Sequence, residues 1–99
     1  MESQDVFEEI RETYIKALKE YNRLSESLAN SRGNVDRGFI DHYALLQWMM
    51  GYTFGLYKSV RDCLNRDEEN RMRALVDEIK IMVTNLGSDL TQWMKRAGK

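Results

Sequence analysis

The sequence predicts an all-α fold in which three long antiparallel helices form an up-down-up bundle with coiled-coil-like packing. Three observations predict it: apolar residues recur every three or four positions over two long stretches, the 99-residue chain contains no proline, and 31% of its residues are charged. A helix buries one face with this spacing, and proline is the residue that would interrupt it. Because a chain of this length has room for one core, we expect a single helical domain over residues 1–99.

The first helix is predicted over about residues 3–30. Its apolar residues follow an unbroken spacing of three and four positions, which strict alternation in a strand could not produce. They are Phe7, Ile10, Tyr14, Ala17, Tyr21, Leu24 and Leu28. Turn-forming residues follow over 30–34, and Gly33 suits the left-handed position after a helix. The chain is therefore expected to reverse there.

The second helix, over about residues 36–64, is expected to be the most buried. Its large apolar residues cover an arc of roughly 200° at the helical spacing of 100° per residue, which is more than a surface helix needs. They are Tyr52, Leu45, Leu56, Met49, Val60, Leu46, Leu64, Tyr57, Met50 and Phe54. Cys63 lies on the same arc, so we expect a buried and inert thiol.

The third helix is predicted over about residues 67–97. Its apolar spacing again alternates between four and three positions, along Met72, Val76, Ile79, Val83, Leu86, Leu90, Trp93 and Ala97. Its start is acidic and its end is basic, the charge order that a helix dipole favours. Asn65 and Glu68 resemble a capping box just before it. Since no glycine or proline marks the boundary, one continuous helix from 36 to 97 is the alternative.

A strip of smaller residues on the second helix is the candidate interface: Ala44, Gln47, Trp48, Gly51 and Gly55. Two glycines inside a helix cost about 1 kcal/mol each relative to alanine, a cost that close approach of another backbone normally offsets. Three interpretations are open. Helix 1 or helix 3 crosses closely there within the monomer, a helix of another chain packs there, or the strip is simply exposed.

The composition excludes several classes of function. One cysteine cannot form an internal disulfide, one histidine leaves little for acid–base chemistry, and no phosphate loop, nucleophile elbow or Cys-x-x-Cys motif occurs. We therefore expect no catalytic residue, no metal site, no cofactor and no enzyme activity. An enzyme whose site is shared across a helical dimer would need charges on the core spacings, and only Arg61 lies on an apolar face.

The expected location is the cytoplasm. The N-terminus is acidic without an apolar segment behind it, and the longest uncharged stretch, 43–57, is shorter than the about 20 apolar residues that a membrane span requires. No membrane association is expected.

The leading functional hypothesis is a non-catalytic protein–protein interaction or assembly module, a small helical subunit or adaptor that forms a homodimer or binds another protein. The alternative is a small helical subunit of a nucleoprotein complex, with basic helix ends that contact nucleic-acid phosphates. Its candidate residues are Arg32, Arg37, Lys95, Arg96 and Lys99. The net charge of −1 makes nucleic acid the weaker partner.

Overall fold

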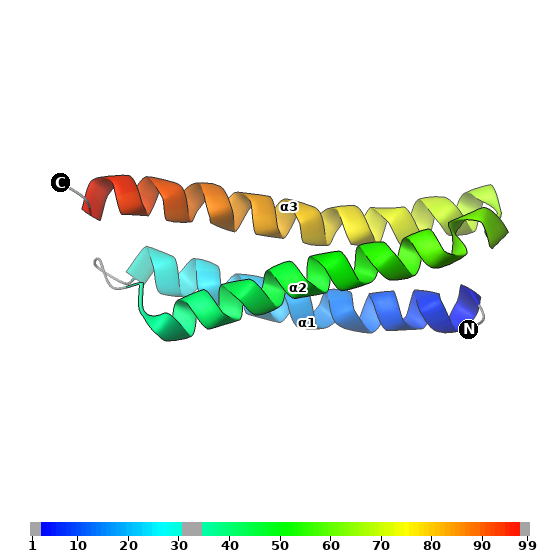
Figure 1. Ribbon diagram of the computed structural model, residues 1–99, viewed down its shortest axis with the longest axis horizontal. Helices are drawn as coiled ribbons and strands as arrows, with labels where there is room; N and C mark the ends of the chain where they lie inside the picture. The colour runs from blue at the N-terminus through cyan, green and yellow to red at the C-terminus, as the bar shows by residue number, and fades with distance from the viewer. Residues whose placement is uncertain (1–2, 31–34, 98–99) are drawn as a thin grey trace.

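The computed structural model describes residues 3–30 and 35–97, and within them three long α-helices pack side by side without any β-strand. The helices are α1 (Ser3–Asn30), α2 (Arg37–Val60) and α3 (Arg66–Ala97), with a short 3-10 turn, η1 (Arg61–Cys63), after α2. Figure 1 shows α2 running antiparallel to both α1 and α3 along a bundle of 51 × 18 × 16 Å. The predicted three-helix bundle is confirmed.

The core-facing line of α1 is displaced slightly from the predicted spacing. The buried residues are Val6, Ile10, Thr13, Ala17 and Leu24. The predicted aromatic positions, Phe7, Tyr14 and Tyr21, are half-buried and pack against the edge of the core. These aromatic side chains are long enough to contact the core from positions beside the buried face of the helix. The predicted bounds of this helix agree with the structure.

The first reversal is described only at its two ends. The predicted turn residue Gly33 lies outside the described residues, within 31–34. On the far side, Asp36 caps α2, because its Oδ1 accepts a hydrogen bond of 2.9 Å from the backbone N–H of Phe39. The second helix therefore begins at Arg37, one residue after its predicted start.

The second reversal excludes one continuous helix from 36 to 97. The backbone N–H of Asn65 donates to Glu68 Oε1 at 3.1 Å, and the backbone N–H of Glu68 donates to Asn65 Oδ1 at 2.9 Å. These reciprocal bonds are the predicted capping box. Leu64, immediately before it, has an extended backbone with φ −95° and ψ 145°. The chain therefore breaks between η1 and α3.

Cys63 is exposed, and the prediction of a buried thiol is wrong. The α-helix ends at Val60, before the predicted end at 64, and residues 61–63 form a 3-10 turn. A 3-10 turn has three residues per turn, so the spacing of 100° per residue no longer places Cys63 on the apolar arc.

The core consists of two clusters, one toward each end of the bundle. The larger cluster includes Ala17, Leu24, Phe39, Leu46, Met49, Ile79, Met82, Val83 and Leu86. The smaller cluster contains Val6, Ile10, Tyr57, Val60, Met72 and Val76. The buried threonines Thr13 and Thr53 fall between the clusters along α1 and α2, and Thr53 Oγ1 donates to the Met49 carbonyl at 2.9 Å.

Among the residues whose burial is described, α2 has six buried in 24, α1 five in 28 and α3 six in 31, so the middle helix has the highest fraction of buried residues, as predicted. However, it also carries four of the eight large apolar side chains that are exposed in the described chain: Ile40, Leu45, Trp48 and Phe54. Two neighbouring helices do not cover its apolar arc. No helix among the described residues combines the length and hydropathy of a membrane span.

Candidate interaction surface

One side of α2 is not covered by either neighbouring helix, and we call it the outer face. It comprises the exposed residues Ile40, Ala44, Gln47, Trp48, Gly51, Phe54 and Gly55. At 100° per residue these positions fall within an arc of about 120°. The five residues predicted as an interface all belong to it. Trp48 is 61% exposed, Ile40 47% and Phe54 43%, so large apolar groups lie among the small ones.

The two glycines of the outer face have open space above them. A Cβ atom built on Gly51 or Gly55 would meet nothing within 4 Å outside the local helix backbone. Neither α1 nor α3 crosses closely at these positions. The first interpretation, an intrachain crossing that offsets the cost of the glycines, is therefore wrong.

The close approach occurs instead at Gly87 in α3. A Cβ atom there would lie 2.8 Å from Tyr43 Oη, which donates a hydrogen bond of 3.3 Å to the Val83 carbonyl. Sequence reasoning missed this contact, because the residue facing Gly87 comes from another helix. Nothing in the local sequence distinguishes Gly87 from Gly51 or Gly55.

Trp48 forms one edge of the outer face, on the side of α1. Its ring stacks on Tyr52 with centroids 4.8 Å apart and planes at 10°. Tyr52 Oη in turn donates to Glu9 Oε1 at 3.0 Å. This hydrogen bond and, to a smaller extent, burial raise the pKa of Tyr52. The exposed Trp48 indole therefore packs on the Tyr52 ring, which is hydrogen-bonded to α1.

Phe54 forms the opposite edge, where a groove of about 630 Å³ runs between α2 and α3. Lys58 Nζ lies 5.4 Å from the centre of the Phe54 ring, within the range of a cation–π contact. The groove is lined by Met50, Gly51, Phe54, Gly55 and Tyr57 from α2 and by Arg73, Val76, Asp77 and Lys80 from α3. The outer face therefore continues into this groove at its Phe54 edge.

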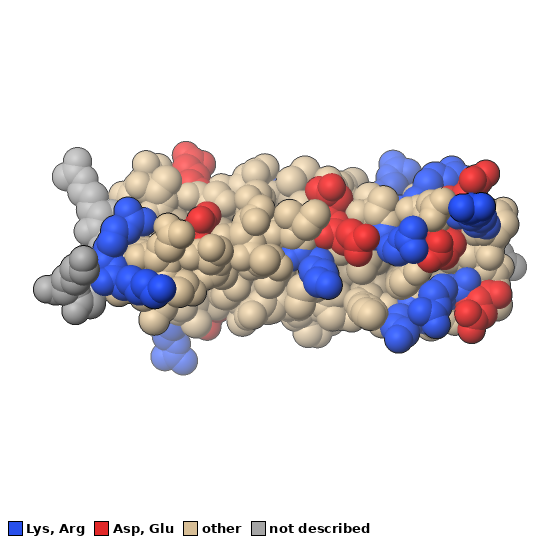
Figure 2. Space-filling model, turned by 90° about the horizontal axis from the view of Figure 1, so that it is seen from above, with Lys and Arg blue, Asp and Glu red and all other residues tan. Residues whose placement is uncertain are grey.

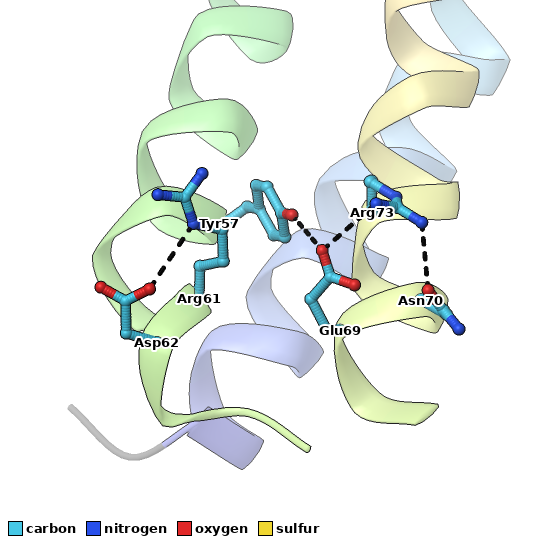
Figure 3. A network of polar contacts seen from close by, with 6 residues as sticks. All are labelled: Tyr57, Arg61, Asp62, Glu69, Asn70 and Arg73. Carbon is cyan, nitrogen blue, oxygen red and sulfur yellow. Dashed lines mark hydrogen bonds and ion pairs between the residues drawn. The ribbon is translucent and has the colours of Figure 1, made fainter. Parts of the chain in front are cut away.

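A polar network fixes the two walls of this groove near the second reversal (Figure 3). Tyr57 Oη donates to Glu69 Oε1 at 2.5 Å, and Arg73 Nη1 lies 3.4 Å from the same oxygen. Arg73 Nη2 also donates to Asn70 Oδ1 at 3.0 Å. The hydrogen bond to Glu69 and, to a smaller extent, burial raise the pKa of Tyr57. These contacts link α2 to α3 at this end of the groove.

Charged side chains gather mainly toward the ends of the face that Figure 2 shows, which is viewed from the side of α3. Arg37, Lys95 and Arg96 are exposed, and they lie at the end where α2 begins and α3 finishes (Figure 1). Arg32 and Lys99 lie outside the described residues. Three of the five predicted phosphate contacts thus share one end of the bundle.

Sequence reasoning missed Ile40 and Phe54 as members of the outer face. A signal for Ile40 existed, because it precedes Ala44 by four positions and continues the same spacing of three and four. Phe54 was assigned to the apolar arc, and its exposure depends on where α3 lies. The contribution of α3 to the groove has no signal in the sequence of α2.

Searches of protein families, curated proteins and solved structures find no match to this chain.

Proposed function

We propose that this chain is a non-catalytic protein–protein interaction and assembly module that self-associates through the outer face of α2. The observation that carries the proposal is the combination of exposed Trp48 and Phe54 with uncovered Gly51 and Gly55 between them. Aromatic side chains, tryptophan above all, dominate the binding energy of protein interfaces when they become desolvated.

The glycines support the proposal through their cost. Gly51 and Gly55 destabilise α2 by about 1 kcal/mol each relative to alanine, and no intrachain contact offsets that cost. A helix from another chain would offset it, because glycine permits the closest approach of two helix axes. Trp48 and Phe54 would then lose their exposure on either side of the contact.

The nucleoprotein alternative has less support. Its three described bases, Arg37, Lys95 and Arg96, lie at helix ends, and the last two complement the dipole of α3 without any ligand. Their position at one end of the bundle does not by itself distinguish phosphate binding from a solvated helix terminus. The interaction module is therefore the function that we propose.

The test is the molecular mass of the purified chain over a wide range of concentration, measured by analytical ultracentrifugation. We expect the mass to rise with concentration toward that of a dimer. The double variant Gly51→Leu/Gly55→Leu should remain monomeric and should keep its helicity, because the space above both glycines is open in the monomer.

The matched control places the same two leucines on an exposed side of another helix, as Ala74→Leu/Ser88→Leu in α3. This variant should associate as the wild type does, which excludes a general effect of added apolar surface. A wild-type chain that stays monomeric at every concentration, or a glycine variant that associates normally, would contradict the proposal.

A further inference from the structure

We infer that Glu20 holds the neutral imidazole of His42 in the tautomer with its hydrogen on Nδ1, so that the exposed Nε2 presents a lone pair to solvent. The chain then has a surface position that binds hydrogen-bond donors, at a contact between α1 and α2. Neither residue belongs to the outer face, so the inference is independent of the proposed function.

Glu20 and His42 meet at two atoms that solvent does not reach. Oε2 of Glu20 lies 3.1 Å from Nδ1 of His42. Both atoms have almost no accessible surface, and neither forms a hydrogen bond with any of the described residues. The charged residues near them in the sequence, Lys16, Arg23 and Asp41, form no ion pair with either side chain. Buried polar atoms nearly always have a partner, so the state of this pair needs an explanation.

A proton on Nδ1 explains the contact. A neutral imidazole carries one hydrogen, and the nitrogen without it presents a lone pair. With the hydrogen on Nε2, the Nδ1 lone pair would face the Glu20 carboxylate at 3.1 Å, where solvent does not screen the repulsion. With the hydrogen on Nδ1, the positive end of the N–H dipole lies beside the carboxylate.

Electrostatics selects between the two tautomers. The two atoms are not aligned as a hydrogen bond, so the selection comes from charge and distance. A low local dielectric strengthens both the repulsion of the lone pair and the attraction of the N–H group. The carboxylate therefore favours the Nδ1–H tautomer.

The other ring nitrogen lies on the exposed edge of the imidazole. The His42 side chain is 36% exposed although Nδ1 is not, so solvent reaches the ring from the opposite edge, which carries Nε2. The contact that one ring nitrogen makes determines the protonation of the other. Nε2 of the neutral ring is therefore an acceptor, and the groups that fit it are hydrogen-bond donors.

The tautomer is measured directly by long-range ¹H–¹⁵N correlation on the ¹⁵N-labelled full chain. His42 is the only histidine in the sequence, so all imidazole signals belong to it. At a pH where the ring is neutral and its shifts no longer change, we expect the pyrrole-type ¹⁵N shift of a protonated nitrogen at Nδ1 and the pyridine-type shift at Nε2. An imidazole without this contact shows averages over both tautomers.

Glu20→Gln tests whether the carboxylate selects the tautomer. It removes the charge and introduces an amide that can donate as well as accept, so both ¹⁵N shifts should move toward their averages. Glu12→Gln is the matched control, because Glu12 is an exposed acid on the same helix and forms no ion pair in the described part of the chain. This control should leave both ring shifts as they are in the wild type.

A protonated Nδ1 in the wild type and in Glu12→Gln, lost in Glu20→Gln, supports the inference. A protonated Nε2 or averaged shifts in the wild type overturn it, and so does an Nδ1 proton that Glu20→Gln leaves in place. The wild-type spectrum decides the tautomer whether or not a variant folds. The oligomeric state enters none of these outcomes, so the proposed self-association is tested separately.

Discussion

Gly51, Gly55 and Gly87 all lie inside long α-helices, but the atoms around them differ. Gly51 and Gly55 carry open space above α2, whereas Gly87 receives the hydroxyl of Tyr43 from the facing helix. Conformational entropy favours alanine over glycine inside any helix, so the surroundings decide how much of that gain each glycine-to-alanine substitution keeps.

Gly51→Ala and Gly55→Ala should each raise the free energy of unfolding of the monomer by up to about 1 kcal/mol, because the added methyl group meets nothing. Gly87→Ala should stabilise the monomer less than the other two substitutions do, because its Cβ would lie 2.8 Å from Tyr43 Oη and the hydroxyl would have to move away from the Val83 carbonyl. Denaturant unfolding at a concentration where the chain is monomeric measures all three. Equal stability of the Gly51 and Gly87 variants would contradict this assignment.

At the scale of the element, side-chain caps define where the helices begin. Asp36 caps α2, and Asn65 with Glu68 forms the box at the start of α3. These starts were predictable, since a cap acts within four residues of sequence. The end of α2 was not predictable to the residue, because no glycine or proline marks it and the 3-10 turn at 61–63 replaces the last predicted helical turn. The misplacement of Cys63 follows from that single difference.

Asn65→Ala should lower the free energy of unfolding by about 1 kcal/mol, because it leaves the backbone N–H of Glu68 without its side-chain acceptor. Urea unfolding, followed by helicity, measures the change. Asn70→Ala is the matched control: Asn70 lies inside α3 and accepts only an exposed hydrogen bond from Arg73 among the bonds described for it. A control variant destabilised as strongly as Asn65→Ala would argue against the capping box.

At the scale of the whole molecule, tyrosines of α2 connect it to both neighbouring helices. Tyr52 donates to Glu9 in α1, and Tyr57 donates to Glu69 in α3. The pKa of each phenol is raised by its carboxylate acceptor, so the folded state holds both phenolic protons more tightly than the unfolded chain does. This stabilisation is complete below the ordinary tyrosine pKa of about 10 and is lost as the pH rises through the folded-state pKa.

The free energy of unfolding should therefore fall with increasing pH above about pH 10. Tyr57→Phe should reduce the steepness of that fall, and at neutral pH it should cost about 1 kcal/mol for the lost hydrogen bond. Thermal unfolding as a function of pH, for the wild type and the variant, measures both effects. An identical alkaline slope in the two proteins would show that Tyr57 holds no extra proton in the folded state.

The overall fold was predictable because the spacings in α1 and α3 each select one buried face. The uncovered side of α2 was not fully predictable, because its apolar arc is wider than either neighbour covers. From the sequence alone, Gly51 allowed an intrachain crossing, an intermolecular contact or simple exposure. The positions of α1 and α3 beside α2 exclude the intrachain crossing. Those positions depend on residues far from Gly51 in the sequence.

The division of the core into two clusters has a further consequence for how the bundle opens. Clusters separated along a long bundle can lose their contacts one at a time, so we expect protection from hydrogen exchange to divide into two local units. Gly51 lies on α2 between Met49 of the larger cluster and the buried Thr53. A helix bound across this position spans the boundary between the two units, and its binding would couple their opening.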